Sequence, residues 1–168
     1  IVGYTTSIPE FTDGSGDFFI RTDDSDHGAF VEYTGKQGDY YFAGMDLDGE
    51  GDSLPLTMSF SGIDITGYTD LTFSSLFAED DDGTNEDWDL SDYVHIDYQV
   101  DNGGYQALMW FESIPDGDSH NSVPALDTDF DGNGDGKVLT DAFDLFTADI
   151  TGTGSTLDLR LTFQLNAG

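Results

Sequence analysis

Residues 127–140 carry oxygen side chains at every second position of a glycine-rich segment. The oxygen-bearing residues are Asp127, Asp129, Asp131, Asn133 and Asp135. The glycines between them are Gly132, Gly134 and Gly136, which permit the positive-φ turns that would curl a loop around a cation. Calcium takes about 6–8 oxygen ligands in flexible geometry. The spacing therefore predicts a calcium-binding loop, with a solvated acidic turn as the alternative.

The register of this loop stays open. An EF-hand loop has twelve residues and ends in a bidentate Glu. If the loop here starts at Asp127, Asp129 or Asp131, its twelfth residue is not acidic in any of the three cases. No amphipathic helix pattern flanks the loop. We therefore expect a loop between strands that takes a further ligand from elsewhere in the chain.

Two other segments are rich in acids. In Asp46–Asp52 the acids alternate as Asp46, Asp48 and Glu50. The segment Glu79–Asp92 holds eight acids and no base, and its candidate ligands include Asp80 and Asp82. Both segments are further candidate calcium loops, and for each the alternative is a solvated connection.

The charge balance excludes some partners. Among 168 residues, 35 acids face four bases, which gives a net charge of −31. This field opposes nucleic acids, whose binding relies on Lys and Arg contacts with phosphate. Self-repulsion on this scale favours a saline or calcium-rich setting. Cysteine is absent and no apolar run is long enough to cross a membrane, so we expect neither disulfides nor a membrane span.

Period-2 alternation dominates the chain, while helix signals are nearly absent. Strands are predicted at residues 18–22, 29–34, 39–45, 54–61, 71–78, 93–100, 105–112 and 157–165. The last segment is the clearest, because Leu157, Leu159 and the following odd-numbered residues are apolar and the residues between them are polar. Asp101–Gly104 predicts a hairpin turn. We predict an all-β fold, an antiparallel β-sandwich of jelly-roll type with long acidic calcium-binding loops, formed as one domain over residues 1–168.

Aromatic residues near polar groups indicate a carbohydrate surface, because flat rings stack on sugar faces while Asp, Asn and Gln bind hydroxyls. The candidate residues are Trp110, Trp88, Tyr105 and Tyr98. Strand alternation places either Trp110 or Phe111 in the core, so core packing is the alternative for Trp110.

Catalysis is poorly supported. Among so many acids some pair always meets the spacing of a glycosidase, so the pattern has no specificity. A serine triad would need His27, His95 or His120, and no Gly-x-Ser-x-Gly turn accompanies them. We expect a protein that is not an enzyme.

Several segments resemble a β-sandwich module of secreted marine bacterial proteins. They include residues 11–19, 46–51, 60–68, 77–83, 127–132 and 152–160. Such modules lie beside extracellular nuclease or phosphatase domains or in large surface proteins. The resemblance implies an extracellular, non-catalytic and calcium-stabilised jelly roll, and the charge balance adds the expectation of a halophilic protein.

The resemblance has one departure. The family pattern continues with a further acidic turn and a strand after the position of Gly168. If that strand is missing, an open sheet edge is left, and self-association through this edge becomes an expectation. Three functions remain open: a lectin-like or carbohydrate-binding module, an adhesive or structural domain, and an accessory domain of a secreted nuclease without a ligand of its own.

Overall fold

The computed structural model describes residues 3–12, 17–23, 25, 33–48, 53–80, 88–115 and 122–166. These residues form strands and no helix. The strands are β1 (Thr5–Thr6), β2 (Phe11–Thr12), β3 (Phe18–Thr22), β4 (Tyr41–Met45), β5 (Leu56–Asp64), β6 (Leu71–Phe77), β7 (Tyr93–Val100), β8 (Gln106–Ser113), β9 (Pro124–Asp127), β10 (Asp144–Ile150) and β11 (Thr156–Gln164). Within the described residues, no helix is long and apolar enough to cross a membrane.

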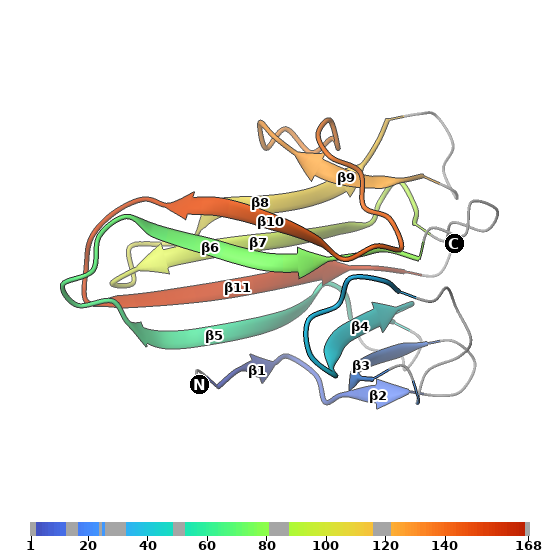
Figure 1. Ribbon diagram of the computed structural model, residues 1–168, viewed down its shortest axis with the longest axis horizontal. Helices are drawn as coiled ribbons and strands as arrows, with labels where there is room; N and C mark the ends of the chain where they lie inside the picture. Colours follow the sequence, from blue (N-terminus) through green and yellow to red (C-terminus); the bar gives the residue numbers. More distant parts are fainter. Residues whose placement is uncertain are drawn as a thin grey trace.

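The strands form three antiparallel sheets (Figure 1). The largest has six strands in the order β1-β5-β11-β7-β8-β9, while β10 pairs with β6 and β2-β3-β4 form the third sheet. The long strand β11 lies between β5 and β7, with Leu161 opposite Met58 on one side and Ile96 on the other. The predicted all-β, antiparallel fold is therefore confirmed.

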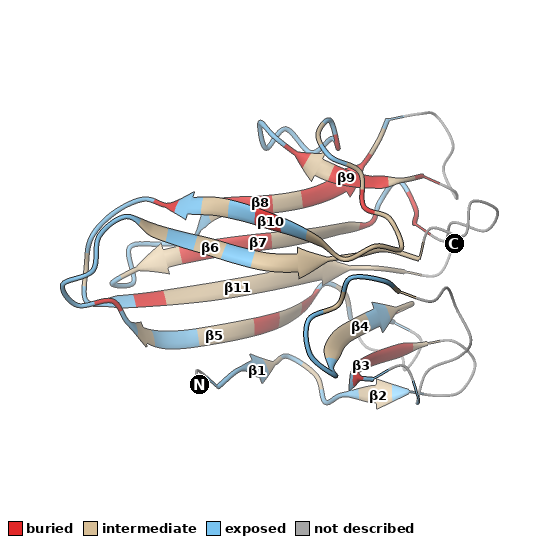
Figure 2. Ribbon diagram, in the orientation of Figure 1, coloured by how far each residue is buried: buried red, intermediate tan, exposed pale blue. Residues whose placement is uncertain are grey.

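Both small sheets pack on the same face of the six-stranded sheet. Along β11, Leu157 and Leu159 belong to one apolar cluster with Phe146 of β10, and Phe163 belongs to a second cluster with Phe19 of β3. Leu161 contacts both clusters. Because these β11 side chains alternate to one side, one sheet face carries both parts of the core. Figure 2 shows buried residues concentrated along β3, β8 and β9.

The predicted strands match the observed ones where alternation is regular, as in β7 and β11. Four strands were missed: the two-residue strands β1 and β2, which are too short to show alternation, and the longer strands β9 and β10. In β9 nearly every residue is buried, so no alternation marks it. In β10 the apolar Leu145 is 60 % exposed on the outer side, which obscures the inward row of Phe146, Ala148 and Ile150. The predicted strand 29–34 lies mostly outside the described residues.

We expect Phe111→Ala to lower the free energy of unfolding by about 3–5 kcal/mol. Phe111 is fully buried, and its ring lies 4.8 Å from that of Phe77 and 5.0 Å from that of Phe146, measured between centroids. The exposed Leu145→Ala is the control and should change the free energy by less than about 0.5 kcal/mol. Urea unfolding at fixed salt measures both, and equal effects would contradict the assignment of the core.

Candidate functional site

Asp127 organises the loop that follows β9. Its side chain is buried, with 1 % exposed. The Oδ1 atom accepts hydrogen bonds from the backbone N–H groups of Asp129, Phe130 and Asp131 at 3.2, 2.7 and 3.3 Å, and Oδ2 accepts one from Gly132 at 2.9 Å. Each carboxylate oxygen has about two lone-pair directions, and Oδ2 accepts a hydrogen bond only from Gly132 among the described residues, so this oxygen can hold the turn and still bind a cation.

The turn brings three carboxylates together. One oxygen each of Asp127, Asp129 and Asp131 lies within 4.8 Å of the others, and Asp129 and Asp131 are exposed. The negative charge of Asp131 is the main cause of a raised pKa at Asp129, with desolvation and the charges of Asp135 and Asp127 adding to it. Repulsion of this kind is what a bound cation would relieve.

The glycines of the loop have two different roles. Gly132 has a φ of +88° and makes the left-handed turn that the sequence predicts. Gly134 and Gly136 do not have positive φ values, and the prediction of such turns was wrong for them. A Cβ atom at Gly134 would collide with the backbone oxygen of Glu112, and one at Gly136 would lie 2.8 Å from the backbone oxygen of Leu126. These two glycines let the loop pack closely on β8 and β9.

Two predicted ligands make other contacts. Asn133 donates from its backbone N–H (3.0 Å) and its Nδ2 (2.8 Å) to Oδ1 of Asp131, so it orients that carboxylate. Asp135 accepts from the backbone N–H and Oγ1 of Thr128 at 2.9 and 2.8 Å, and these bonds lower its pKa. The structure therefore groups the carboxylates of Asp127, Asp129 and Asp131, while one oxygen of Asp135 is held by Thr128. Whether Asn133 and Asp135 add ligands to this cation or to a second one stays a prediction.

A second acidic group lies where β4 ends. Burial is the main cause that raises the pKa of Asp46 to about 6, and hydrogen bonds with Asp48 and Asp17 add to it. The Oδ1 atom of Asp46 is buried and has no hydrogen-bond partner among the described residues. Of the other predicted ligands, Asp80 is partly buried just beyond β6, whereas Glu50 and Asp82 lie outside the described residues.

The outer face of the six-stranded sheet carries a stack of rings. His95 stacks on Tyr93 at 4.1 Å and on Trp110 at 3.9 Å between ring centroids, and its Nε2 is hydrogen-bonded to Glu112. The edge of Phe130, from the acidic loop, meets Trp110 at 5.4 Å. Phe111 is the residue in the core, so strand alternation places Trp110 outside.

Polar groups extend this face toward Tyr105. The Nε1 of Trp110 donates to Oδ1 of Asp97 at 3.1 Å, and Nη2 of Arg160 donates to Oδ2 of the same carboxylate at 2.8 Å. The guanidinium of Arg160 lies 4.1 Å from the ring centre of Tyr105, which is 37 % exposed. A continuous line of contacts therefore links Tyr105 with Phe130 and the acidic loop.

Two predicted sugar-binding rings are not on this surface. Tyr98 is 3 % exposed on the inner face, and its OH is hydrogen-bonded to Oγ1 of Thr151 at 2.7 Å. Trp88 is 8 % exposed, and its Nε1 donates to Oγ of Ser113 at 2.9 Å. Because both rings are packed in the interior, neither offers a face to a ligand, and we remove them from the candidate surface.

Arg160, Asp97 and Phe130 were not predicted as parts of this site. Alternation does place Arg160 and Asp97 on polar faces of their strands, but only the pairing of β11 with β7 sets them opposite each other. The sequence analysis assigned no role to Phe130, which has a positive φ of 61° and is 42 % exposed in the acidic loop. His27 and His120 lie outside the described residues.

No family model matches this chain, and no curated protein or solved structure is significantly similar to it. The resemblance to calcium-binding jelly-roll modules therefore rests on the sequence segments alone.

We expect Asp92 to make stability depend on pH. Asp92 is 2 % exposed, and burial raises its pKa from 3.8 to about 7, against hydrogen bonds from the N–H groups of Asp89 and Asn166. The native state therefore binds a proton more tightly than the unfolded state. The resulting stabilisation is fully present below pH 3.8 and is lost as the pH rises through about 7.

The variant Asp92→Asn isolates this effect from the general charge repulsion. Between pH 4 and pH 8 the unmodified chain should lose about 2 kcal/mol more of its free energy of unfolding than the variant loses. Urea unfolding at several pH values, in EDTA and at constant salt, measures the difference. Identical pH profiles for the two chains would show that Asp92 does not titrate in this range.

Proposed function

We propose that the chain is a non-catalytic, calcium-stabilised binding module of a larger secreted or cell-surface bacterial protein, with carbohydrate as its ligand class. The observation that carries the proposal is the convergence of Asp127, Asp129 and Asp131 beside an aromatic surface. We further propose that the three sheets form a β-sandwich of jelly-roll connectivity. The packing of both small sheets on one face of the large sheet supports the sandwich.

Calcium suits the loop better than other common cations. The candidate ligands are all oxygens, which excludes the nitrogen and sulfur sets that select zinc or copper. The two exposed carboxylates leave room for water molecules and for the variable coordination number that calcium accepts, whereas magnesium demands a near-ideal octahedron. Extracellular modules bind calcium with dissociation constants of about 10⁻⁴–10⁻³ M, which a saline environment rich in calcium would saturate.

The role of the cation would be mainly structural. Without it, the repulsion that raises the pKa of Asp129 opposes the closed loop. When calcium is present, it binds the native state and not the unfolded state, and this difference stabilises the native state by mass action. The loop also carries Phe130 and packs on β8 through Gly134. A cation that fixes the conformation of the loop would therefore also fix the contact between Phe130 and Trp110 on the outer face.

We expect calcium to raise the melting temperature of the chain by about 5–10 °C at 10 mM, if the dissociation constant is about 10⁻⁴ M. The comparison is with EDTA at the same high sodium chloride concentration, so that general screening is constant. Magnesium at the same dose should give less than half the shift. An equal shift from both ions would mean that only general charge neutralisation is measured.

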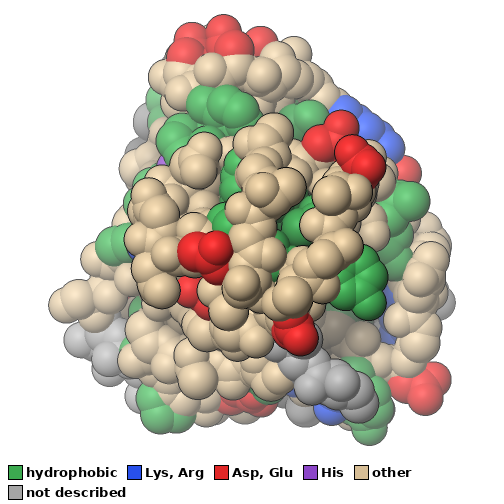
Figure 3. Space-filling view, turned by 90° about the vertical axis from the view of Figure 1, so that its left-hand side faces the viewer, with side chains coloured by type: hydrophobic (Ala, Val, Ile, Leu, Met, Phe, Trp, Pro, Cys, Tyr) green, Lys and Arg blue, Asp and Glu red, His purple; other side chains and the backbone are tan. Residues whose placement is uncertain are grey.

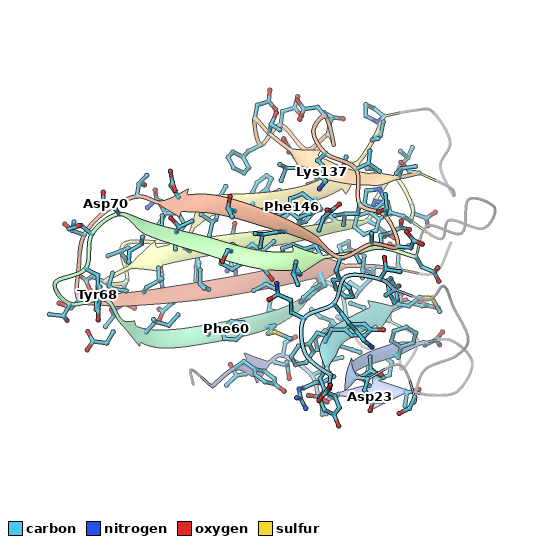
Figure 4. All side chains as sticks on the ribbon, in the orientation of Figure 1. Asp23, Phe60, Tyr68, Asp70, Lys137 and Phe146 are labelled. Atoms are coloured by element: carbon cyan, nitrogen blue, oxygen red, sulfur yellow. The ribbon has the colours of Figure 1, made fainter. Side chains whose placement is uncertain are left out.

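Two variants of equal charge test the position of the site. Asp129→Asn should remove most of the shift caused by calcium, because it deletes one of the three converging carboxylates. Asp70→Asn removes the same charge from an exposed turn at the left end of the molecule in Figure 4, well apart from Lys137 of the acidic loop, and should retain the full shift. If Asp129→Asn keeps the shift, the cation binds elsewhere.

Carbohydrate is supported by the chemistry of the outer face. Tyr105 and Phe130 offer exposed ring surface for the C–H faces of a sugar. Between them the guanidinium of Arg160, held by Asp97, is only partly buried and can donate to hydroxyls. The face is largely preformed, since Trp110 is held between His95 and Phe130 and is tied to Asp97. Preorganised rings lose little entropy on binding.

We expect Tyr105→Ala to weaken binding to a glycan by about tenfold or more, as is typical for loss of a stacking ring. The glycan would first be identified by a glycan array probed with the calcium-saturated chain, and affinities would be measured by calorimetry. Tyr40→Ala is the control, because Tyr40 is 49 % exposed just before β4, in the small sheet that packs on the inner face. Equal loss in both variants, or no glycan bound at all, would count against carbohydrate.

A second candidate function is an association domain that joins polypeptides through an open sheet edge. The observation that favours it is that β6 and β4 each pair on only one side among the described residues. Unpaired edges are sites where another strand can add.

A further inference from the structure

The middle of the outer face consists of side chains from three neighbouring strands that stand opposite one another. Arg160 of β11 pairs with Asp97 of β7. One step along, Thr162 of β11 pairs with His95 of β7, which pairs with Trp110 of β8. The cavities of about 850 and 370 Å³ are both lined by other residues. A ligand of the outer face would therefore lie across the surface of the sheet and not in either cavity.

The charged side chains beside Trp110 already have partners. Asp97 accepts a hydrogen bond from Nη2 of Arg160 at 2.8 Å, and Glu112 is hydrogen-bonded to Nε2 of His95. A carboxylate on a sugar would meet Asp97 as well as Arg160, so it would gain little. An ammonium group would have to compete with Arg160 for Asp97 and with His95 for Glu112. The middle of the face therefore suits an uncharged ligand that forms hydrogen bonds.

The border of the face adds a bias against anions. Figure 3 shows Asp and Glu side chains gathered at the top of the molecule, over the loop that follows β9. In this loop Asp129 and Asp131 are exposed on either side of Phe130. The whole chain has a net charge of −31, which repels uronic acids and sulfated sugars. High salt screens this long-range field, so direct contacts would decide between uncharged and cationic sugars.

The exposed rings are separated by more than the width of one sugar. Tyr105 is 37 % exposed just before β8, and Phe130 is 42 % exposed and meets Trp110. From Tyr105 to Trp110 the chain advances by five residues, which is about 15 Å along a strand. A sugar ring and an aromatic ring are similar in size, so one sugar covers one of the exposed rings. Contact with both takes a chain of several sugars along β8.

A sheet surface favours a chain that is itself extended. Hexoses joined by β-1,4 bonds form a ribbon, whereas α-linked chains curl into helices. The ribbon presents C–H faces along its length, and these would stack on Tyr105 and Phe130. Its hydroxyls project from its edges, where the guanidinium of Arg160 lies 4.1 Å from the ring centre of Tyr105 and can donate to them.

We propose that the outer face binds an uncharged, extended chain of β-1,4-linked hexoses that lies along β8 and contacts Tyr105 and Phe130 at the same time. This inference rests on the proposed function, because it names the class of carbohydrate for the same face. It assigns no sugar contact to the carboxylates of the acidic loop.

The first test is the dependence of affinity on chain length. The probes are β-1,4-linked oligomers of glucose and of mannose with two, four and six sugars. Calorimetry at saturating calcium and constant salt measures their binding. We expect the better of the two hexasaccharides to bind about tenfold or more tightly than its disaccharide, because only the longer chain reaches both rings. Equal affinities for all lengths would overturn the proposal, since one sugar would then account for the whole contact.

Variants of Tyr105 locate the chain on the face. Tyr105→Ala should weaken hexasaccharide binding by about tenfold or more and remove most of the gain with length, because only Phe130 remains exposed for stacking. Tyr105→Phe retains the ring and should stay within about threefold of the unmodified chain. Tyr40→Ala, on an exposed ring of the small sheet, should change neither value. Full dependence on length in Tyr105→Ala would overturn the proposal.

The choice of an uncharged chain is tested with hexasaccharides that differ only in their charge. The β-1,4-linked hexamer of glucosamine is compared with that of glucose, and the hexamer of mannuronic acid with that of mannose. We expect the mannuronic acid chain to bind more weakly by about tenfold or more, and the glucosamine chain to bind no more tightly than glucose. Tighter binding of either charged chain would overturn the proposal.

Failure of this inference differs from failure of the proposed function. If a glycan array shows binding to other glycans while no β-1,4-linked hexose chain binds, this inference is overturned and the carbohydrate function stands. If no glycan binds at all, both are overturned. The calcium shift of the melting temperature is measured separately and bears on neither result.

Discussion

The structure depends on the burial of one apolar row along β11. Leu157, Leu159, Leu161 and Phe163 project to a single face, and burial of side chains of this size contributes about 1.5–3 kcal/mol each. Since β11 lies in the middle of the six-stranded sheet, its row forms the floor on which both small sheets pack. The position of β10-β6 and that of β2-β3-β4 both follow from this floor.

Electrostatic repulsion is the opposing constraint. With a net charge of −31, compactness requires that carboxylates be hydrogen-bonded, neutralised or kept apart. The chain uses each of these solutions. Asp127 is surrounded by backbone N–H groups, Asp97 is paired with Arg160, and burial raises the pKa of Asp92 to about 7. Asp129 and Asp131 have no base beside them in the acidic loop, which makes this loop the place where a cation would stabilise the fold most directly.

The large sheet presents two different faces. The acidic loop, Trp110 and Tyr105 belong to the outer face and its border, whereas the apolar row of β11 belongs to the inner face. The central strands β7 and β11 contribute to both faces through alternate residues, such as Ile96 inward and Asp97 outward. Because successive side chains of a strand point to opposite faces, one sheet can contribute both to the core and to the outer surface.

The sequence alone determined the all-β class, because strict alternation over β7 and β11 permits only strands with one apolar face. It also located the acidic loop, because the spacing of Asp127, Asp129 and Asp131 is local and a single turn brings them together. Tertiary structure decided the rest. Whether Trp88 and Tyr98 are buried depends on which layer covers them, and the pairing of Asp97 with Arg160 depends on the contact between strands 63 residues apart. Likewise, Asp135 turns toward Thr128 because the loop packs on β9. The cavity of about 850 Å³ is not encoded in any one segment either, since strands far apart in the sequence, such as β4, β6 and β11, line it together.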